Sequence, residues 1–225
     1  TGVVVPKLLA RSSASHLVGM QTRLPLGLRQ TQVVAVAPDG RVMGSRAKRL
    51  LFPVAERRMW GWGSDWLVRG RAPVMLRVAG LDLIPIICGE LMARNLIAEG
   101  VAAGGKVLTV SARDQMMPTP QALRMLLAVQ VLRSVEFGVP SVRSSFGGWA
   151  SFVSAAGEVL AVSGRSRNGI LFWDAQRGQR DLDFWGEPIK PGQPPPKRPP
   201  PQIAVVYSRM SPALSLRCPE GRCSY

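Results

Sequence analysis

Residues 81–88 read LDLIPIIC, and Gly89 and Glu90 follow directly. The run from Leu81 to Cys88 is almost entirely apolar, which is typical of a strand buried on both faces of a sheet. Pro85 has no N–H donor and therefore predicts an irregularity in the hydrogen-bond ladder of that strand. The sequence thus predicts a central strand that ends at a cysteine and turns at once into the next element.

Helical spacing follows this strand and recurs once more. ELMARNLIAEG (Glu90 to Gly100) predicts a helix that ends at glycine, and KVLTVS (Lys106 to Ser111) returns to strand. A second helix is predicted from Gln121 to Phe137, because Thr119-Pro120 precedes it and Gly138 follows it. These elements alternate in the way that a sheet covered by helices requires.

Short apolar runs bounded by turn residues predict the remaining strands. Pro38-Asp39-Gly40 predicts a tight hairpin turn between two of them. In chain order, these expected strands are 2–6, 17–20, 32–37, 41–43, 74–78, 141–144, 149–153 and 158–162. The order of strands and helices predicts the α/β class, with a mixed sheet covered by helices.

The composition changes toward the C-terminus. Eight of the fourteen residues from Pro188 to Pro201 are proline, which favours extended polyproline II structure. A spacer is the preferred interpretation over a ligand for an aromatic groove. We therefore expect a folded domain over 1–187, a Pro-rich linker over 188–201 and a poorly ordered tail over 202–225.

The chain of 225 residues is strongly basic, with 29 Lys and Arg against 14 Asp and Glu and a net charge of +15. Its 46% hydrophobic content is enough for one sizeable core. The charge would attract nucleic acid or an anionic membrane surface, and it does not choose between them. No run reaches the roughly 18 apolar residues of a membrane span, and the chain begins at Thr1 without Met or a signal-peptide pattern, so we expect a soluble fragment.

Several classes of site are excluded by residue counts. His16 is the sole histidine, which excludes a Ser–His–Asp hydrolase and a multi-histidine metal site. Cys218 and Cys223 have no second pair and so predict neither a zinc site nor a disulfide framework. GVAAGG (Gly100 to Gly105) lacks the Lys-Ser/Thr of a nucleotide-binding loop. No metal and no cofactor are predicted.

Tryptophans gather after the basic run of residues 45–51. Trp60, Trp62 and Trp66 lie beside Arg57 and Arg58, with glycines between them. Core packing and contact with a membrane interface are both compatible with this pattern.

Two segments carry residues that could perform chemistry. The cysteine turn, Ile87 to Glu90, would hold the Cys88 thiol where a strand meets a helix, a place that stabilises a thiolate. A buried structural thiol is the alternative interpretation. The lysine segment, Lys48 to Glu56, reads KRLLFPVAE and predicts an extended loop with a cation and a carboxylate eight residues apart.

Together the two segments resemble motifs of the carbon–nitrogen hydrolase (nitrilase) superfamily. Its lysine motif is K-R-x-L-x-P-x-G-E, and Lys48 to Glu56 matches it with Ala55 in place of glycine. Its cysteine motif is I-C-aromatic-E, and the cysteine turn matches it with Gly89 in place of the aromatic residue. In order along the chain, PDGRVMG (38–44), RSVEFGVPSVR (133–143) and GGWASFVSAAGEV (147–159) are similar to the extracytoplasmic domain of the apolipoprotein N-acyltransferase family.

This resemblance covers residues 3–163 and implies a nitrilase-type four-layer α-β-β-α sandwich. It implies that Cys88 is the nucleophile, that Lys48 stabilises the oxyanion and that Glu56 is a second carboxylate of the site. Glu90 would orient the cysteine turn. The implied reaction passes an acyl group from a phospholipid donor to a lipoprotein acceptor through a thioester, at the extracytoplasmic face of a bacterial inner membrane.

One departure leaves alternatives open. The family's base glutamate follows V-W-P, and the matching residues here are Val4-Val5-Pro6-Lys7. Either another carboxylate, such as Glu56, serves as base, or the chain is a catalytically degenerate homologue, for example a conjugal-transfer-type protein with a binding or structural role. A third alternative is a basic polyanion-binding module in which arginines contact phosphates and Cys88 is buried.

Overall fold

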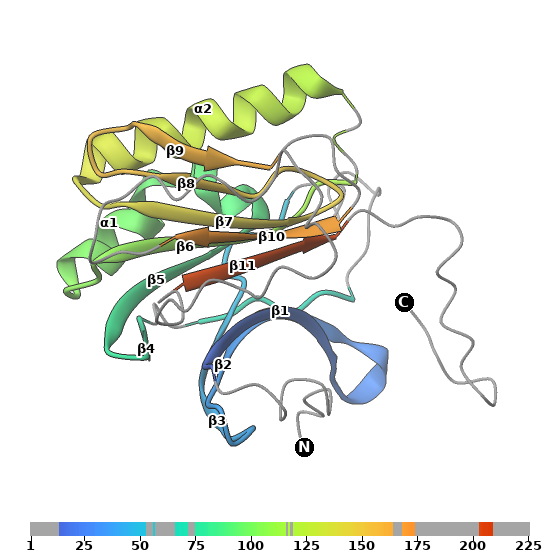
Figure 1. Ribbon diagram of the computed structural model, residues 1–225. Coiled ribbons are helices and arrows are strands. Elements are labelled where there is room, and N and C mark those ends of the chain that lie inside the picture. The colour runs from blue at the N-terminus through green and yellow to red at the C-terminus, as the bar shows by residue number, and fades with distance from the viewer. Residues whose placement is uncertain are drawn as a thin grey trace, which may run out of the picture.

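The computed structural model describes residues 14–52, 56, 66–71, 75–115, 117 and 119–163, together with the backbone of 168–173 and 203–208. The strand expected over 2–6, Lys7, Trp60, Trp62 and the Pro-rich segment lie outside the described residues. Figure 1 shows that the described elements stack in layers: two helices over a large sheet, and a small sheet below it.

The small sheet is antiparallel throughout. Its strands are β1 (His16–Arg23), β2 (Arg29–Val36) and β3 (Val42–Ala47), paired in that order. A 3-10 turn, η2 (Pro25–Gly27), joins the first two strands. The expected Pro38-Asp39-Gly40 turn joins β2 to β3, with the Gly40 N–H donating to the Ala37 carbonyl over 2.9 Å. The hairpin prediction is therefore confirmed.

The large sheet is mixed. It contains β4 (Leu76–Val78), β5 (Leu81–Ile87), β6 (Val107–Arg113), β7 (Ser141–Phe146), β8 (Ser151–Val153), β9 (Val159–Val162), β10 (Asn168–Trp173) and β11 (Ile203–Ser208). The order is β10-β11-β7-β6-β5-β4, with the β8–β9 hairpin also paired to β7. Strands β5, β6 and β7 are parallel, while β4 and β8 run antiparallel to their neighbours.

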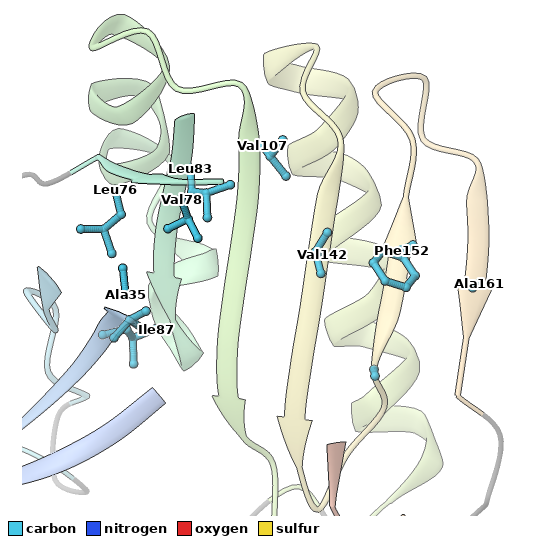
Figure 2. Packing of buried hydrophobic residues seen from close by; sticks show 11 residues of the cluster. Ala35, Leu76, Val78, Leu83, Ile87, Val107, Val142, Phe152 and Ala161 are labelled. Carbon is cyan, nitrogen blue, oxygen red and sulfur yellow. The ribbon is translucent and has the colours of Figure 1, made fainter. Parts of the chain in front are cut away.

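Strand β5 is buried on both faces, as its apolar sequence predicts. Leu83 and Ile87 belong to the core between the two sheets, while Ile84 and Ile86 belong to the core under the helices. Figure 2 shows Ala35 of β2 beside Ile87 in the first of these cores. The register of β5 with β6 runs without a shift past Pro85, so the missing N–H donor does not displace the strand.

The second predicted helix forms almost as expected. Helix α2 (Pro120–Phe137) begins after Thr119, whose Oγ1 accepts a hydrogen bond of 3.2 Å from the Ala122 N–H. It ends at Gly138, whose φ of 61° is a left-handed conformation that glycine adopts without strain. Both ends thus follow from local capping chemistry.

The first helix begins later than its periodicity predicts. Residues of a 3-10 turn, η3 (Cys88–Met92), come first, and α1 (Arg94–Ala102) starts only after Ala93 adopts φ −87° and ψ 90°. The Glu90 side chain is bound to backbone N–H groups around it, as described below, so the chain here follows those bonds and not the helical spacing.

The sheet also extends past the Pro-rich segment. Strand β11 lies within residues 202–225, expected as a tail, and it pairs antiparallel with β10 and contacts β7 through Ser208 and Phe146. The apolar run IAVVY at 203–207 explains this strand, because β-branched and aromatic residues suit a sheet.

The two helices are joined by a charged cluster with a predictable pH response. Arg94 of α1 and Arg133 of α2 both donate to Glu136, and the Arg94 hydrogen bond foremost holds the pKa of Glu136 below its usual range. A lowered folded-state pKa means that this contribution to stability is present above the unfolded pKa and is lost as pH falls through the folded one. We expect Arg94→Ala to raise the Glu136 titration midpoint in an NMR titration and Arg77→Ala to leave it unchanged; an unmoved midpoint in Arg94→Ala would contradict this assignment.

Candidate functional site

Lys48 is the first residue after β3 and is buried, with 1% of its surface exposed. Its Nζ lies 2.7 Å from Oε1 and 2.6 Å from Oε2 of Glu56. Its backbone is fixed on both sides, because its N–H donates to the Thr31 carbonyl and its carbonyl accepts from the Gly70 N–H. The structure therefore holds one ammonium group in a defined place away from water.

Glu56 closes the lysine segment on itself. Its Oε2 accepts from the Phe52 N–H over 2.9 Å, and its own N–H donates to the Phe52 carbonyl over 2.9 Å. A buried charge without a partner would cost several kcal/mol, so the carboxylate is what permits Lys48 to be buried and charged. The pairing of Lys48 with Glu56 was expected as two groups of one site, and the structure brings them into direct contact.

Cys88 follows β5 directly and is half-buried. Its φ of 53° is left-handed, a conformation that costs a side-chain-bearing residue about 1–3 kcal/mol. Such a strained turn after a strand is the geometry that presents a nucleophile at the edge of a sheet. Cys88 also packs against the core between the sheets, which is the contact expected of a structural thiol.

Glu90 ties the cysteine turn to the lysine segment. Its side chain is fully buried, and its Oε1 accepts from the Arg49 and Leu50 N–H groups over 2.6 and 3.0 Å. Its Oε2 accepts from the Ile87 N–H over 2.9 Å and from the guanidinium of Arg46. Since four donors from β3, the lysine segment and the cysteine turn meet on one carboxylate, the positions of these segments depend on one another.

Phe52 contacts the cysteine turn where the family motif has an aromatic residue. A Cβ built on Gly89 would lie 1.8 Å from Cε2 of Phe52, so the ring occupies the space that a side chain at 89 would need. The Phe52 ring of the lysine segment therefore packs directly against the cysteine turn at Gly89.

This contact predicts a non-additive pair of substitutions. Gly89→Ala should cost about 1–2 kcal/mol, because the methyl group forces the Phe52 ring out of its contact. Adding Phe52→Ala should recover most of that loss, since the clash then disappears. Urea unfolding of both singles and the double measures the coupling, and strictly additive losses would show that ring and turn do not touch.

A further buried ion pair lies at the same edge of the large sheet. Asp114, just after β6, accepts two hydrogen bonds of 2.9 and 2.8 Å from Nη2 of Arg143 in β7 and a third from Ser145. The carboxyl ends of parallel strands β5, β6 and β7 meet at this edge, where α/β sheets place their ligand sites. Sequence reasoning missed this pair and Arg46; an arginine within SVRSSF, a strand with buried neighbours, was the available signal.

The remaining predicted features are placed as follows. Trp66 is exposed and lies under the guanidinium of Arg29, 4.9 Å from the ring centroid. His16 begins β1. Among the described residues, no three His, Cys, Asp or Glu side chains gather in a way that could hold a metal ion. No helix in this part of the chain is long and apolar enough to cross a bilayer.

Comparison with known sequences gives no family: no family model matches the chain, and no curated protein matches it. Comparison with solved structures gives a consistent fold. A carbon–nitrogen hydrolase from Helicobacter pylori G27 matches with a TM-score of 0.59 at 14% identity, covering 70% of this chain and 60% of that one. A nitrilase-superfamily member of branch 10 from Saccharomyces cerevisiae matches at 0.55 and 14% identity, over 66% and 54% of the two chains.

A third match is a nitrilase-superfamily amidase from Nesterenkonia sp. AN1, with a TM-score of 0.58 at 19% identity, covering 70% of this chain and 61% of that one. That amidase has been seen with an acetamide moiety added covalently to its active-site cysteine. The present chain thus spans about three-fifths of the length of these structures. Its fold is the α/β nitrilase type, as the sequence predicts.

Proposed function

We propose that this chain, which has the carbon–nitrogen hydrolase fold, carries an acyl group on Cys88. The observation that supports the proposal most is the bond network of Glu90, which fixes the cysteine turn against a segment that holds a buried ammonium and carboxylate. A purely structural thiol would need neither the buried ammonium nor the carboxylate beside it. In a water-poor site a fixed cation stabilises a developing oxyanion far more than it would in water.

The proposed reaction begins with removal of the thiol proton by a carboxylate, for which we assign Glu56. The Cys88 thiolate attacks the carbonyl carbon of an ester, and the carbonyl electron pair moves to oxygen. The Lys48 ammonium donates to both carboxylate oxygens of Glu56, and we assign its third N–H as the donor to this oxyanion. When the tetrahedral intermediate collapses, the ester C–O bond breaks and the leaving alkoxide takes the proton from Glu56. A thioester on Cys88 remains.

The second half releases the acyl group. An acceptor amine attacks the thioester carbonyl, the C–S bond breaks, and the thiolate recovers a proton that the amine loses. The products are an amide and the free Cys88 thiol, so no cofactor is consumed. In this scheme Glu90 is a positioning residue, because it acts through the backbone of both segments.

We further propose that the donor is a phospholipid and the acceptor a lipoprotein amine, at the extracytoplasmic face of a bacterial inner membrane. The similarity of 38–44, 133–143 and 147–159 to the acyltransferase branch supports this finer assignment. The charge of +15 is consistent with it, because such a charge would attract an anionic membrane surface. Donor and acceptor both remain proposals.

The test is intact-mass spectrometry after incubation with phosphatidylethanolamine vesicles. We expect an adduct with the mass of one acyl chain, removed by hydroxylamine because thioesters are labile to it, and absent from Cys88→Ser. Cys218 and Cys223 remain in that variant, so peptide mapping of the adduct controls for acylation elsewhere. No adduct from folded protein would contradict the acyl-transfer proposal and favour the degenerate homologue.

A further inference from the structure

A cavity of about 250 Å³ lies beside the lysine segment, and three arginines line it: Arg49, Arg69 and Arg71. Ala93, which precedes α1, and Asn95 in its first turn also line the cavity. A water takes roughly 30 Å³ of liquid, so the space would hold roughly eight waters or one oxyanion with a small substituent. Its lining differs from that of the Cys88 site, because it contains no nucleophile and no carboxylate.

The chain brings these arginines together through a close backbone approach. The Gly70 N–H donates to the Lys48 carbonyl over 2.7 Å, and a Cβ at Gly70 would lie 2.5 Å from the carbonyl oxygen of Ala47. Residues 69–71 can therefore lie flat against the end of β3 only because residue 70 has no side chain. This contact places Arg69 and Arg71 on either side of Gly70, facing the same cavity as Arg49.

The positive charge of the cavity is only partly compensated. Arg49 donates to Glu99, whereas Arg69 and Arg71 are exposed and form no ion pair within the part of the chain that the structure describes. The first turn of α1 contains no acidic residue. Among the described residues, the three guanidinium groups thus share one carboxylate, which leaves two charges there without an acidic partner around an open space.

We propose that this cavity binds a phosphate group, as a phosphate ester. Guanidinium groups present paired N–H donors that fit phosphate oxygens, and several such groups around one anion are the usual basis of phosphate recognition. This proposal is separate from the proposed acyl transfer, because the phosphate group would be bound in the cavity without reacting. The phosphate could belong to a lipid headgroup or to a soluble ester, and the same cavity would serve both.

The test compares two doubly substituted proteins with equal net charge. Arg69→Gln/Arg71→Gln removes two cavity arginines, and Arg41→Gln/Arg77→Gln removes two exposed arginines on other loops and strands. Calorimetric titration with inorganic phosphate at constant ionic strength should show saturable binding to the parent protein. We expect about tenfold weaker binding in the cavity variant and unchanged binding in the control, since each lost charge-assisted contact weakens phosphate binding.

Binding experiments with vesicles and with a soluble phosphate ester distinguish the two possible sources of the phosphate group. If phosphatidylcholine vesicles containing phosphatidic acid bind, and only the cavity variant loses that binding, the ligand is a headgroup. If glycerol 3-phosphate binds with the same dependence and vesicles do not, the ligand is a soluble ester. Absence of saturable phosphate binding, or equal losses in the cavity and control variants, would overturn the proposal. Neither result depends on Cys88, so this test fails or succeeds separately from the acyl-transfer proposal.

Discussion

Glu90→Ala is expected to destabilise the protein by about 3–5 kcal/mol, as when one partner of a buried ion pair is removed. The reason is that Arg46, with 3% of its surface exposed, would keep its charge without its carboxylate partner. The Ile87, Arg49 and Leu50 N–H groups would lose their acceptor in the same step. The loss should therefore separate the cysteine turn from the lysine segment.

Urea unfolding measures this change, and Asp39→Ala is the matched control. Asp39 also pairs with an arginine, but both side chains are exposed and the ion pair spans 3.8 Å. We expect its removal to cost less than about 1 kcal/mol, the usual worth of a surface ion pair. Equal, small losses in both variants would show that Glu90 does not organise the site.

Asp114→Ala is expected to have an effect of similar size, about 3–5 kcal/mol, for the same physical reason. Arg143 is buried and already has one guanidinium nitrogen, Nη1, without a hydrogen-bond partner within the described residues. Removing the carboxylate would take away both bonds to Nη2 and leave a buried charge uncompensated.

A second variant distinguishes the loss of a charge partner from a general failure to fold. Asp114→Ala/Arg143→Met removes both charges, and an apolar side chain of similar length can fill the space of the arginine. We expect the double to be more stable than Asp114→Ala by at least about 1 kcal/mol, because replacing a whole buried pair is often neutral. A double that is less stable than the single, measured by urea unfolding, would rule out a charge-based explanation.

Much of the fold could be predicted because local sequence determined it. After Asp82 the run at 83–88 is entirely apolar and has no polar face, so burial on both sides could be predicted, and Thr119 with Gly138 marked both ends of α2. Helix α1 could not be placed from its spacing, because the Glu90 side chain binds backbone groups about forty residues earlier in the chain. Such a long-range bond leaves no periodic signal.

The site was predicted in part for a similar reason. Cys88, Lys48, Glu56 and Glu90 stand in two short motifs, so a motif comparison found them. The other buried charges of the region lie outside these motifs. Arg46, the ion-pair partner of Glu90, lies in what reads as an ordinary basic run. Asp114 and Arg143, which pair with each other, are 29 residues apart in the chain with nothing local to connect them. The contact between Phe52 and Gly89 could not be predicted either, since it joins two segments that are 37 residues apart in the chain.

The measurement that tests the central claim most directly is the rate at which iodoacetamide alkylates Cys88 near neutral pH, followed by peptide mass spectrometry. Cys218 and Cys223 provide reference thiols in the same sample. If Lys48 and Glu56 activate the thiol, Cys88 in the parent protein should react about tenfold faster than in Lys48→Met, because a nearby ammonium favours the thiolate. Arg77→Met should not change the rate. Equal rates in the parent and in folded Lys48→Met would contradict the claim that these residues form one reactive site.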